Sequence, residues 1–155
     1  MEYYKYLRNY VGHAPIMLVG SAVLIYKGDK ILLQKRHDNG CWGKHGGVAD
    51  LYENVEDTAR RELMEEIGVS VGKLSLLEVY SGKEYTVKYA NGDIANYVDV
   101  VFYTDQLIGT PVTDSNEVDE VMWFDIENLP ENINKNDREP ILDLVKLLKE
   151  RNNAR

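Results

Sequence analysis

Three glutamates in the segment 54–67 are spaced so that they could hold a metal ion together. If this segment is a helix, at about 100° per residue Glu62, Glu65 and Glu66 fall on one face, where like charges repel. A divalent cation that prefers oxygen ligands, such as Mg²⁺, would remove the repulsion. The alternative is a solvated acidic face, with the two arginines of the segment as partial counterions.

The charge of the chain is concentrated around such acids. The 155 residues carry a formal net charge of −8, of which residues 50–69 hold −5 and residues 114–131 hold −7, so the rest carries +4. An acidic chain repels polyanions, which argues against long nucleic acid as a partner. Two acidic segments on a mildly basic background favour a hard-cation site beside groups that tolerate phosphate. Two solvated acidic surfaces are the alternative.

A longer motif surrounds these glutamates. The chain matches every fixed position of the 23-residue Nudix box: Gly47, then Glu53, then the run Arg61-Glu62-Leu63-Met64-Glu65-Glu66-Ile67-Gly68-Val69. The flanks agree in the runs Leu33-Gln34-Lys35-Arg36, Trp123-Phe124-Asp125 and Leu129-Pro130. The chain is therefore identified as a member of the Nudix hydrolase family, and in outline it resembles the small MutT-like members found in bacteria.

The resemblance implies a fold, an activity and a set of ligands. The fold is of the α/β class, an α/β/α sandwich on a mixed β-sheet with a central Nudix loop and helix. The activity is hydrolysis, dependent on Mg²⁺ or Mn²⁺, of a nucleoside diphosphate linked to another group. Arg61 would hold the loop and the glutamates by charge-assisted hydrogen bonds. The implied metal ligands are the Gly47 carbonyl, Glu53 (directly or through water), Glu62, Glu65 and Glu66.

Hydrolysis of a pyrophosphate also needs a carboxylate that orients or deprotonates the water. In some members of the family this group is a box glutamate, here Glu65 or Glu66, and in others it is an acid on a later loop. Glu117, Asp119 and Glu120 stand just before the last predicted strand, where such a loop acid would lie. We favour Glu120 for this catalytic role; a solvated loop acid is the alternative.

The substrate is only partly indicated. Lys35 and Arg36 are candidates for phosphate contact, although Arg36 could equally be a solvated strand end. Tyr85 lies 16 positions after the box, as does a tyrosine of members that act on dinucleoside polyphosphates. Tyr85, Tyr89 or Tyr97 could stack on a base, or pack within the sheet. Nucleoside triphosphates, including oxidised ones, dinucleoside polyphosphates and nucleotide sugars all stay open, whereas RNA 5′ ends are disfavoured by the acidic charge.

The chain departs from the usual family pattern near the box. Lys44-His45 stands where many members have Leu-Pro, and Asp50 and Tyr52 stand where many have Glu and Gly. None of these is a fixed position, so loop geometry rather than catalysis is in question. We interpret His45 as an incidental loop histidine, with contact to a phosphate as the alternative. The other two histidines lack ligand-like spacing with it, so no histidine–metal site is predicted.

Other functions and partners are constrained as well. A Nudix-fold nucleotide-binding or regulatory module without turnover is the alternative function, but such modules usually lose box carboxylates. A relative of isopentenyl-diphosphate isomerase would need a catalytic cysteine motif that Cys41-Trp42-Gly43 does not resemble. One cysteine and no signal-peptide core indicate a reducing cytoplasm, and no stretch of about 20 apolar residues predicts a membrane span. The predicted partner is a small-molecule nucleotide. The Tyr-rich N-terminal helix could pack on a second copy in a homodimer as readily as on its own chain.

The elements that must position these residues are expected to form one domain, residues 1–155. A short helix is predicted over 2–11, and a C-terminal helix over about 138–151 with Pro140 in its first turn. The box helix begins after Asn54 and ends before Gly68, both typical cap residues. Residues 37–47 are predicted to be a loop. Strands are predicted over 16–26, 30–36, 73–80, 83–89, 94–104 (after an Asn91-Gly92 hairpin turn) and 117–124.

Overall fold

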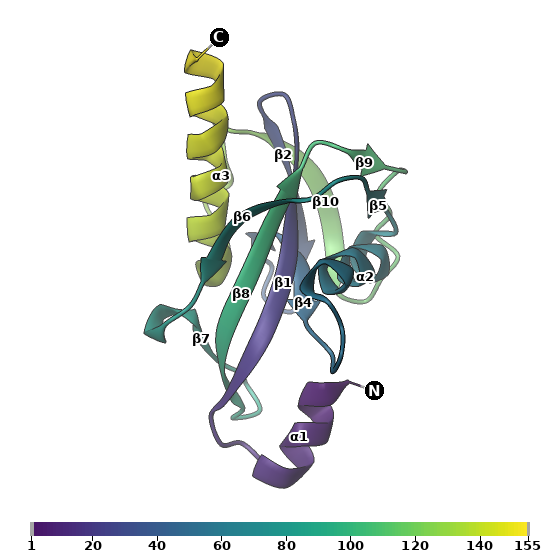
Figure 1. Ribbon diagram of the computed structural model, residues 1–155, viewed down its shortest axis with the longest axis vertical. Helices are drawn as coiled ribbons and strands as arrows, with labels where there is room; N and C mark the ends of the chain where they lie inside the picture. The colour runs from purple at the N-terminus through teal and green to yellow at the C-terminus, as the bar shows by residue number, and fades with distance from the viewer. Residues whose placement is uncertain (1, 155) are drawn as a thin grey trace.

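A computed structural model describes residues 2–154, leaving Met1 and Arg155 of the predicted domain outside the described residues (Figure 1). The helices are α1 (Tyr3–Val11), α2 (Val55–Ile67) and α3 (Lys135–Asn153), with a short 3₁₀ helix η1 (Lys83–Tyr85). The strands are β1 (Ile16–Lys27), β2 (Lys30–Arg36), β3 (Trp42–Gly43), β4 (His45–Val48), β5 (Ser70–Val71), β6 (Ser75–Tyr80), β7 (Thr86–Lys88), β8 (Ile94–Thr104), β9 (Leu107–Ile108) and β10 (Val118–Asp125).

The main sheet is mixed. Its strand order is β10-β2-β1-β8-β6, and β3, β4 and β7 extend β2, β1 and β8. β1 and β8 run parallel, from the pair Ile16 and Ala95 to the pair Ile25 and Thr104, whereas the other pairs of named strands are antiparallel. A parallel pair needs a crossover connection, and α2 lies within that connection.

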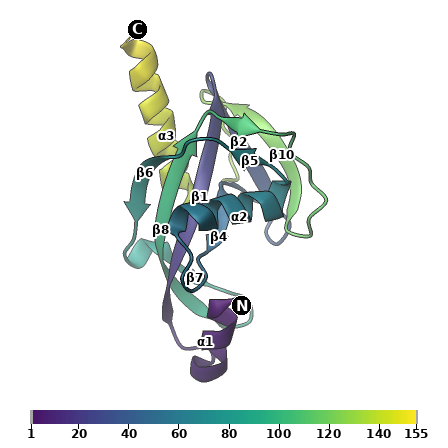
Figure 2. The ribbon, with the colours of Figure 1, turned by 45° about the vertical axis from the view of Figure 1, so that its right-hand side comes forward.

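Two helices cover opposite faces of this sheet (Figures 1 and 2). The continuous apolar run of β1 after Gly20 is buried on both faces, as expected of a strand between two layers. The core under α2 includes Val23, Ile25, Leu63, Ile67 and Phe102. The core under α3 includes Leu24, Leu33, Val101, Ile141 and Leu144. The α/β class and the sandwich predicted from the sequence are therefore confirmed.

The N-terminal helix lies beyond the lower end of the sheet (Figures 1 and 2). Arg8 fastens it to the β7–β8 hairpin by donating to the Ile94 carbonyl at 2.8 Å and by pairing with Asp93 at 3.6 Å. Tyr6 and Tyr10 pack edge to face and stay exposed. A second copy of the chain on this helix stays a prediction. Within residues 2–154, no helix is long and apolar enough to cross a membrane.

The expectation of a continuous loop over residues 37–47 is wrong. β3 pairs with β2, and β4 pairs with β1 through Gly20–Val23, so this segment is folded onto the sheet. Because the segment is rich in glycine, it shows no hydrophobic periodicity from which a strand could be predicted. The same glycines permit close contact between β4 and β1. A β-carbon on Gly46 would lie 2.6 Å from the Cα of Ala22, so only glycine lets β4 approach β1 this closely.

Two further elements differ from expectation. The strand predicted over 83–89 is η1 followed by the short β7, because the chain turns at Gly82, whose φ is 103°. The C-terminal helix begins at Lys135 rather than near Arg138, so the placement of Pro140 in its first turn is wrong. The ring is tolerated one turn further in because it removes a single backbone donor close to the helix start. The small β5–β9 sheet was not predicted.

Candidate active site

The cap residues and the apolar face of the box helix fix its position and thereby the direction of its glutamates. The Asn54 side chain accepts a hydrogen bond from the Glu56 N–H at 2.9 Å, and Gly68 ends the helix with φ of 68°. Its apolar face anchors α2 on the sheet through Ala59, Leu63 and Ile67, all fully buried. Since the register of this face is fixed, the glutamates that flank it are held against the loop that enters the helix.

Glu62 lies directly against the backbone of β4. A β-carbon on Gly47 would be 2.4 Å from Glu62 Cδ, so any side chain there would displace the carboxylate. Gly47 therefore lies against Glu62, and the role of its carbonyl as a metal ligand stays a prediction. Burial raises the pKa of Glu62, and the charges of Glu65 and Glu117 add to this, while Arg61 opposes it.

Arg61 connects the loop to the helix. Its Nε and Nη2 donate to the two oxygens of Glu53 at 2.7 and 2.9 Å, a bidentate pair. Its Nη1 donates to Glu62 at 2.9 Å and to Glu65 at 3.4 Å, and its Nη2 also reaches the Val48 carbonyl at 3.2 Å. The guanidinium lowers the pKa of Glu53 to about 2. One cation is thus shared among three box carboxylates.

Glu66 has a different environment from Glu53. Its side chain is 5% exposed. One oxygen accepts the Gly46 N–H at 2.8 Å and the other accepts the Gln34 side-chain amide. Burial, with the charges of Glu62 and Glu117, raises the pKa of Glu66 to about 8 in spite of these donors. Glu66 is therefore a buried acid whose ionised form has no basic partner among residues 2–154.

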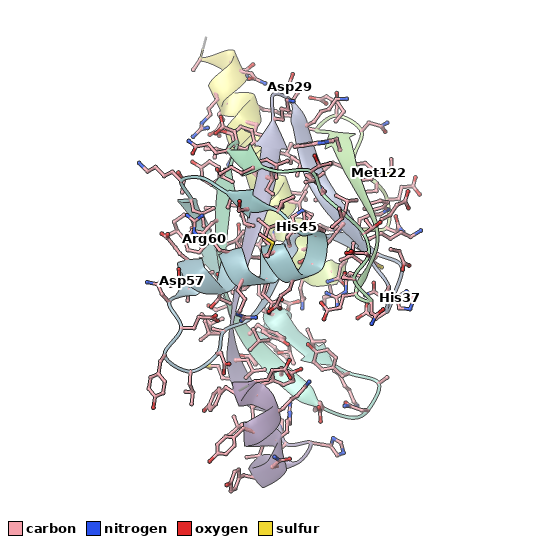
Figure 3. The ribbon with its side chains drawn as sticks, turned by 90° about the vertical axis from the view of Figure 1, so that its right-hand side faces the viewer. Asp29, His37, His45, Asp57, Arg60 and Met122 are labelled. Carbon is pink, nitrogen blue, oxygen red and sulfur yellow. The ribbon has the colours of Figure 1, made fainter. Side chains whose placement is uncertain are left out.

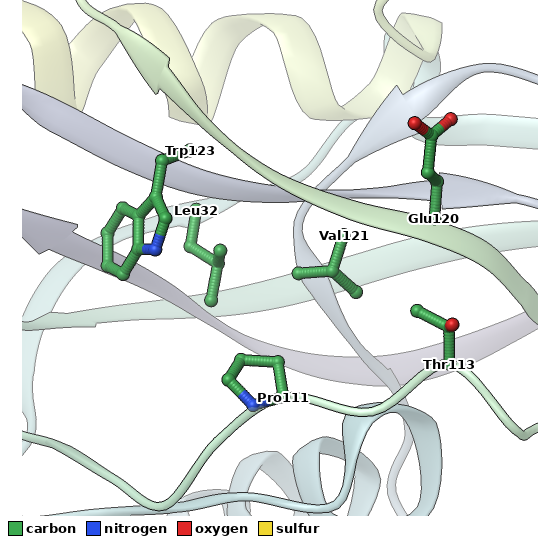
Figure 4. Close-up of a pocket in the computed structure, with 6 residues that line it drawn as sticks. All are labelled: Leu32, Pro111, Thr113, Glu120, Val121 and Trp123. Carbon is green, nitrogen blue, oxygen red and sulfur yellow. The ribbon is translucent and has the colours of Figure 1, made fainter.

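The loop before β10 carries another acid, Glu117, whose charge acts on two box glutamates, and the catalytic role favoured for Glu120 stays a prediction. Glu117 raises the pKa values of both Glu62 and Glu66, so its charge is close to them. Glu120 lines a separate pocket, and Figure 4 shows its carboxylate pointing away from Pro111 and Thr113. A β-bulge between Val118 and Glu120 shifts the register with β2, so the direction of these acids cannot be read from simple alternation.

The donor set fits a hard divalent cation, although no ligand shell is preassembled. Among residues 2–154, no three His, Cys, Asp or Glu side chains converge closely enough to hold a metal ion. Arg61 instead draws Glu53, Glu62 and Glu65 toward itself. Still, Glu62 and Glu66 are carboxylates whose pKa values burial and neighbouring acids raise, Glu62 itself acting on Glu66, and a nearby cation would offset that cost.

The basic residues predicted to contact phosphate lie at the end of β2. Lys35 is half-buried and pairs across the sheet with Glu120 and Trp42. Arg36 forms a two-point contact with Asp38, at 3.0 and 2.7 Å, which raises the pKa of its guanidinium. Its charge is nevertheless felt by Glu66, which lies behind the same strand. Phosphate contact by Lys35 or Arg36 stays a prediction.

The structure places Tyr85 in the core under α3. Its side chain is 7% exposed, its ring packs against Tyr80, and its hydroxyl donates to Glu139. This placement favours the packing role over stacking on a base, because neither face of the ring is open. The hydroxyls of Tyr89 and Tyr97 are hydrogen-bonded to each other.

Sequence reasoning missed three buried polar residues behind the box. His45, expected in a loop, lies in β4 with no exposed surface, so it cannot meet a phosphate in this conformation (Figure 3). It bonds to Gln34 at 2.6 Å, and burial lowers its pKa to about 4. Lys44 is buried between Asp99, at 3.0 Å, and Asp137. In the sequence these residues are marked only as polar residues next to apolar strand residues. That pattern does not show which side chains they contact.

A shallow pocket opens on the α2 side of β2 and β10 (Figure 4). It has a volume of about 360 Å³ and is lined by Leu32, Pro111, Thr113, Glu120, Val121 and Trp123. The loop that forms its rim is fastened to the end of α2, because Ser115 donates to the Glu66 carbonyl at 3.0 Å and the Val112 N–H donates to the Ile67 carbonyl at 2.9 Å. The rim of the pocket is therefore attached to the C-terminal end of the box helix.

Comparisons with known proteins agree with this geometry. A family model described as NUDIX domain matches residues 18–144. An ADP-ribose pyrophosphatase from Methanocaldococcus jannaschii is 34% identical, over 69% of this chain and 61% of that protein. A NAD-capped RNA hydrolase, NudC, from Pseudomonas aeruginosa is 28% identical, over 80% of this chain and 40% of that protein. The chain thus spans between 40% and 61% of the length of these two curated relatives.

A solved structure shares the fold over nearly its whole length. The crystal structure of a MutT NUDIX hydrolase from Burkholderia pseudomallei superposes with a TM-score of 0.72 and 29% identity, covering 83% of this chain and 98% of that one. The part of this chain outside the family match includes α1 and the end of α3.

Proposed function

The chain belongs to the Nudix hydrolase family, and on this premise we propose that it hydrolyses the pyrophosphate bond of a nucleoside diphosphate linked to another group. One observation carries the proposal. Glu66 is buried beside Glu62 and within the field of Glu117, with Arg61 as the one basic residue bonded to the box carboxylates in residues 2–154. A scaffold gains nothing from such a concentration of acids, whereas a cation-assisted reaction requires it.

The cofactor we propose is Mg²⁺, or Mn²⁺ in its place. Bound there, it would supply positive charge to the pyrophosphate oxygens and to the attacking water. The residues that would hold it are Glu62, Glu65 and Glu66, together with the backbone carbonyl of Gly47, a residue that lies against the Glu62 carboxylate. Glu53, which Arg61 engages with both arms, would take part through water or serve to place the arginine.

The chain's own residues do the rest of the work. Arg61 ties the Val48 carbonyl, Glu53 and Glu62 into one unit, so loop and helix present their oxygens together. Glu117, rather than Glu120, is the loop acid we propose to accept a proton from water. The water oxygen then forms a bond to one phosphorus, the bridging anhydride bond breaks, and its electron pair leaves with the departing phosphate.

The chemistry of the site does not select one nucleoside diphosphate derivative as the substrate. The names of the relatives indicate which compounds to test first. Both curated relatives above are named for substrates that contain adenosine diphosphate joined to another group. ADP-ribose and NADH are therefore the first compounds to test, followed by nucleoside triphosphates, dinucleoside polyphosphates and nucleotide sugars. We propose a small-molecule nucleotide as the partner of this site.

The test is a product screen over these compounds with Mg²⁺, with Mn²⁺ and with chelator. We expect a nucleoside monophosphate and the complementary phosphate product from at least one compound, only when a divalent cation is present. Turnover undiminished by chelator would contradict the metal assignment. Binding of a nucleotide without turnover of any compound would instead indicate a ligand-binding module.

A further inference from the structure

We propose that Gln34 and His45 are positioning residues that hold the Glu66 carboxylate in a fixed direction. The inference rests on the proposed function, because it takes Glu66 as a group that meets the cation and the pyrophosphate. The three residues come from three elements, β2, β4 and α2, and meet between the sheet and the helix.

The contacts form a continuous chain. The Gln34 side-chain amide donates to one oxygen of Glu66. The Nδ1–H of His45 donates to the Gln34 carbonyl oxygen at 2.6 Å. The neutral imidazole has one N–H, so Nε2, 3.2 Å from the Leu32 carbonyl, does not donate in this tautomer, and the chain ends on the His45 ring in β4. A rotation of the Gln34 amide would break its bonds to both Glu66 and His45.

Burial makes this chain rigid. The exposed fractions are 0% for His45, 3% for Gln34 and 5% for Glu66, so water does not compete for these bonds. No buried side-chain nitrogen or oxygen in residues 2–154 lacks a hydrogen-bond partner. When Glu66 is ionised, the Gln34 amide must turn its N–H toward the carboxylate, because the flipped amide would place two oxygens against each other.

The second Glu66 oxygen is fixed from the other side. It accepts the Gly46 N–H at 2.8 Å, and Gly46 directly follows His45 in β4. Each oxygen therefore accepts one hydrogen bond and keeps a lone-pair direction for a cation. Without Gln34 the carboxylate would retain one of its two anchors and could rotate about the remaining bond.

Residues behind a metal ligand change affinity even though they do not touch the metal. Removal of such a partner typically lowers metal affinity or activity by about 10- to 100-fold. A buried glutamine with a purely structural role would lower stability when replaced and leave cation affinity unchanged. The two accounts therefore differ in a measurement made on the folded protein without substrate.

The experiment measures Mn²⁺ binding to the full chain by the electron paramagnetic resonance signal of free Mn²⁺. The variants are Gln34→Met, which keeps the length of the side chain and removes both polar ends, and His45→Leu, which leaves Gln34 without its anchor. Thr104→Val is the matched control. Thr104 is 4% exposed and bonds to the Lys73 carbonyl and the Gln106 N–H.

We expect Gln34→Met to weaken Mn²⁺ binding by about 10- to 100-fold, and His45→Leu by a smaller factor, with circular dichroism showing both folded. Thr104→Val should lower the unfolding midpoint and bind Mn²⁺ as the wild type does. The kcat of Gln34→Met should fall in the same proportion, while its KM for the substrate changes little. If Gln34→Met is unfolded, His45→Leu decides the question alone.

Two results would overturn the account, and they are distinguishable. Wild-type Mn²⁺ affinity in the folded Gln34→Met and His45→Leu variants would remove the positioning role and leave the proposed function intact. No Mn²⁺ binding and no hydrolysis by the wild-type protein would remove the proposed function, and the positioning role with it.

Discussion

The two helices that cover the sheet bring acids to it under opposite conditions. On the α3 side each of three acids has a donor from the sheet or its loops: Asp137 pairs with Lys44, Glu139 accepts from Tyr85, and Asp143 accepts from Tyr80. On the α2 side, Glu53, Glu62 and Glu65 share one arginine, and Glu66 has only neutral donors.

The difference teaches how to tell a scaffold from a site. On the α3 side each acid has a donor of its own, a lysine or a tyrosine hydroxyl, so these acids serve to dock the helix and we call this side complete. We call the α2 side incomplete, because burial and like charge raise the pKa values of Glu62 and Glu66 although Arg61 bonds Glu62, and no basic side chain in residues 2–154 bonds Glu66. Changes on the α3 side should therefore cost stability, and changes on the α2 side should cost function.

The largest effect is expected on the complete side, from Lys44→Met. The ammonium is buried between Asp99 and Asp137, so its removal leaves two acids without their counterion. We expect a loss of about 3–5 kcal/mol in the free energy of unfolding, measured with denaturant. Lys149→Met is the control, because its pair with Glu127 is exposed and should matter by less than about 1 kcal/mol. Equally small losses of unfolding free energy in Lys44→Met and Lys149→Met would contradict the stabilising role of the buried lysine.

The next effect is expected on the incomplete side, from Glu66→Gln. The amide mimics the neutral form that burial favours, so stability should stay the same or rise. Turnover should fall by at least about 10²-fold, because a ligand that stabilises charge in the transition state is lost. Steady-state kinetics with Mg²⁺ check this, with Asp143→Asn on α3 as the control that keeps its activity. Full activity in Glu66→Gln would refute the role of this carboxylate.

A smaller effect is expected from Tyr80→Phe on the α3 side. The Tyr80 hydroxyl donates to Asp143 at 2.7 Å, and its loss leaves that carboxylate without this donor. The free energy of unfolding should fall by about 1–2 kcal/mol. Because the change is far from the box in the hydrogen-bond network, kcat should be unchanged. A loss of kcat without a loss of stability would show that the two sides are not separate.

The smallest effect is expected from Tyr52→Gly in the loop before α2. Tyr52 is the one non-glycine residue in 2–154 with positive φ, at 65°, and its side chain is fully exposed. Relief of this backbone strain should raise stability by up to about 1 kcal/mol, seen as a higher thermal midpoint. A lower midpoint would mean that the tyrosine makes a contact that outweighs the strain.

How far the sequence alone leads differs between these regions. β2 and β8 lie where alternation and the Asn91-Gly92 turn predict them, and the caps at Asn54 and Gly68 bound the box helix. Local signals decide such elements. β4 could not be predicted, because its glycines carry no periodicity and only the partner strand shows why they are needed.

Some features of the candidate site were likewise predictable from the sequence, and others were not. The spacing of the box glutamates follows from helix geometry, so their common face was predictable. The choice between Glu117 and Glu120 depends on a bulge in β10, which no pattern in the chain announces. The partners of Glu66 come from strands distant in sequence, so Gln34 and His45 looked like isolated polar residues.

The claim that Glu66 has no basic partner among residues 2–154 is tested most directly by the pH dependence of stability with and without Mg²⁺. Because burial raises the Glu66 pKa from 4.5 to about 8, the stability contributed by its protonated form is fully present below 4.5 and is lost as pH rises toward 8. Buried His45, whose pKa falls from 6.5 to about 4, opposes this trend only below about pH 6.5.

The informative window is therefore pH 6.5 to 8, where Glu66 dominates and the neutral His45 adds no slope. Without cation, the free energy of unfolding should fall by about 1 kcal/mol per pH unit across this window, and saturating Mg²⁺ should reduce or remove the fall. The Glu66→Gln variant should give the same flatter curve in both conditions. A wild-type curve that is flat without cation, or that Mg²⁺ leaves unchanged, would contradict the account.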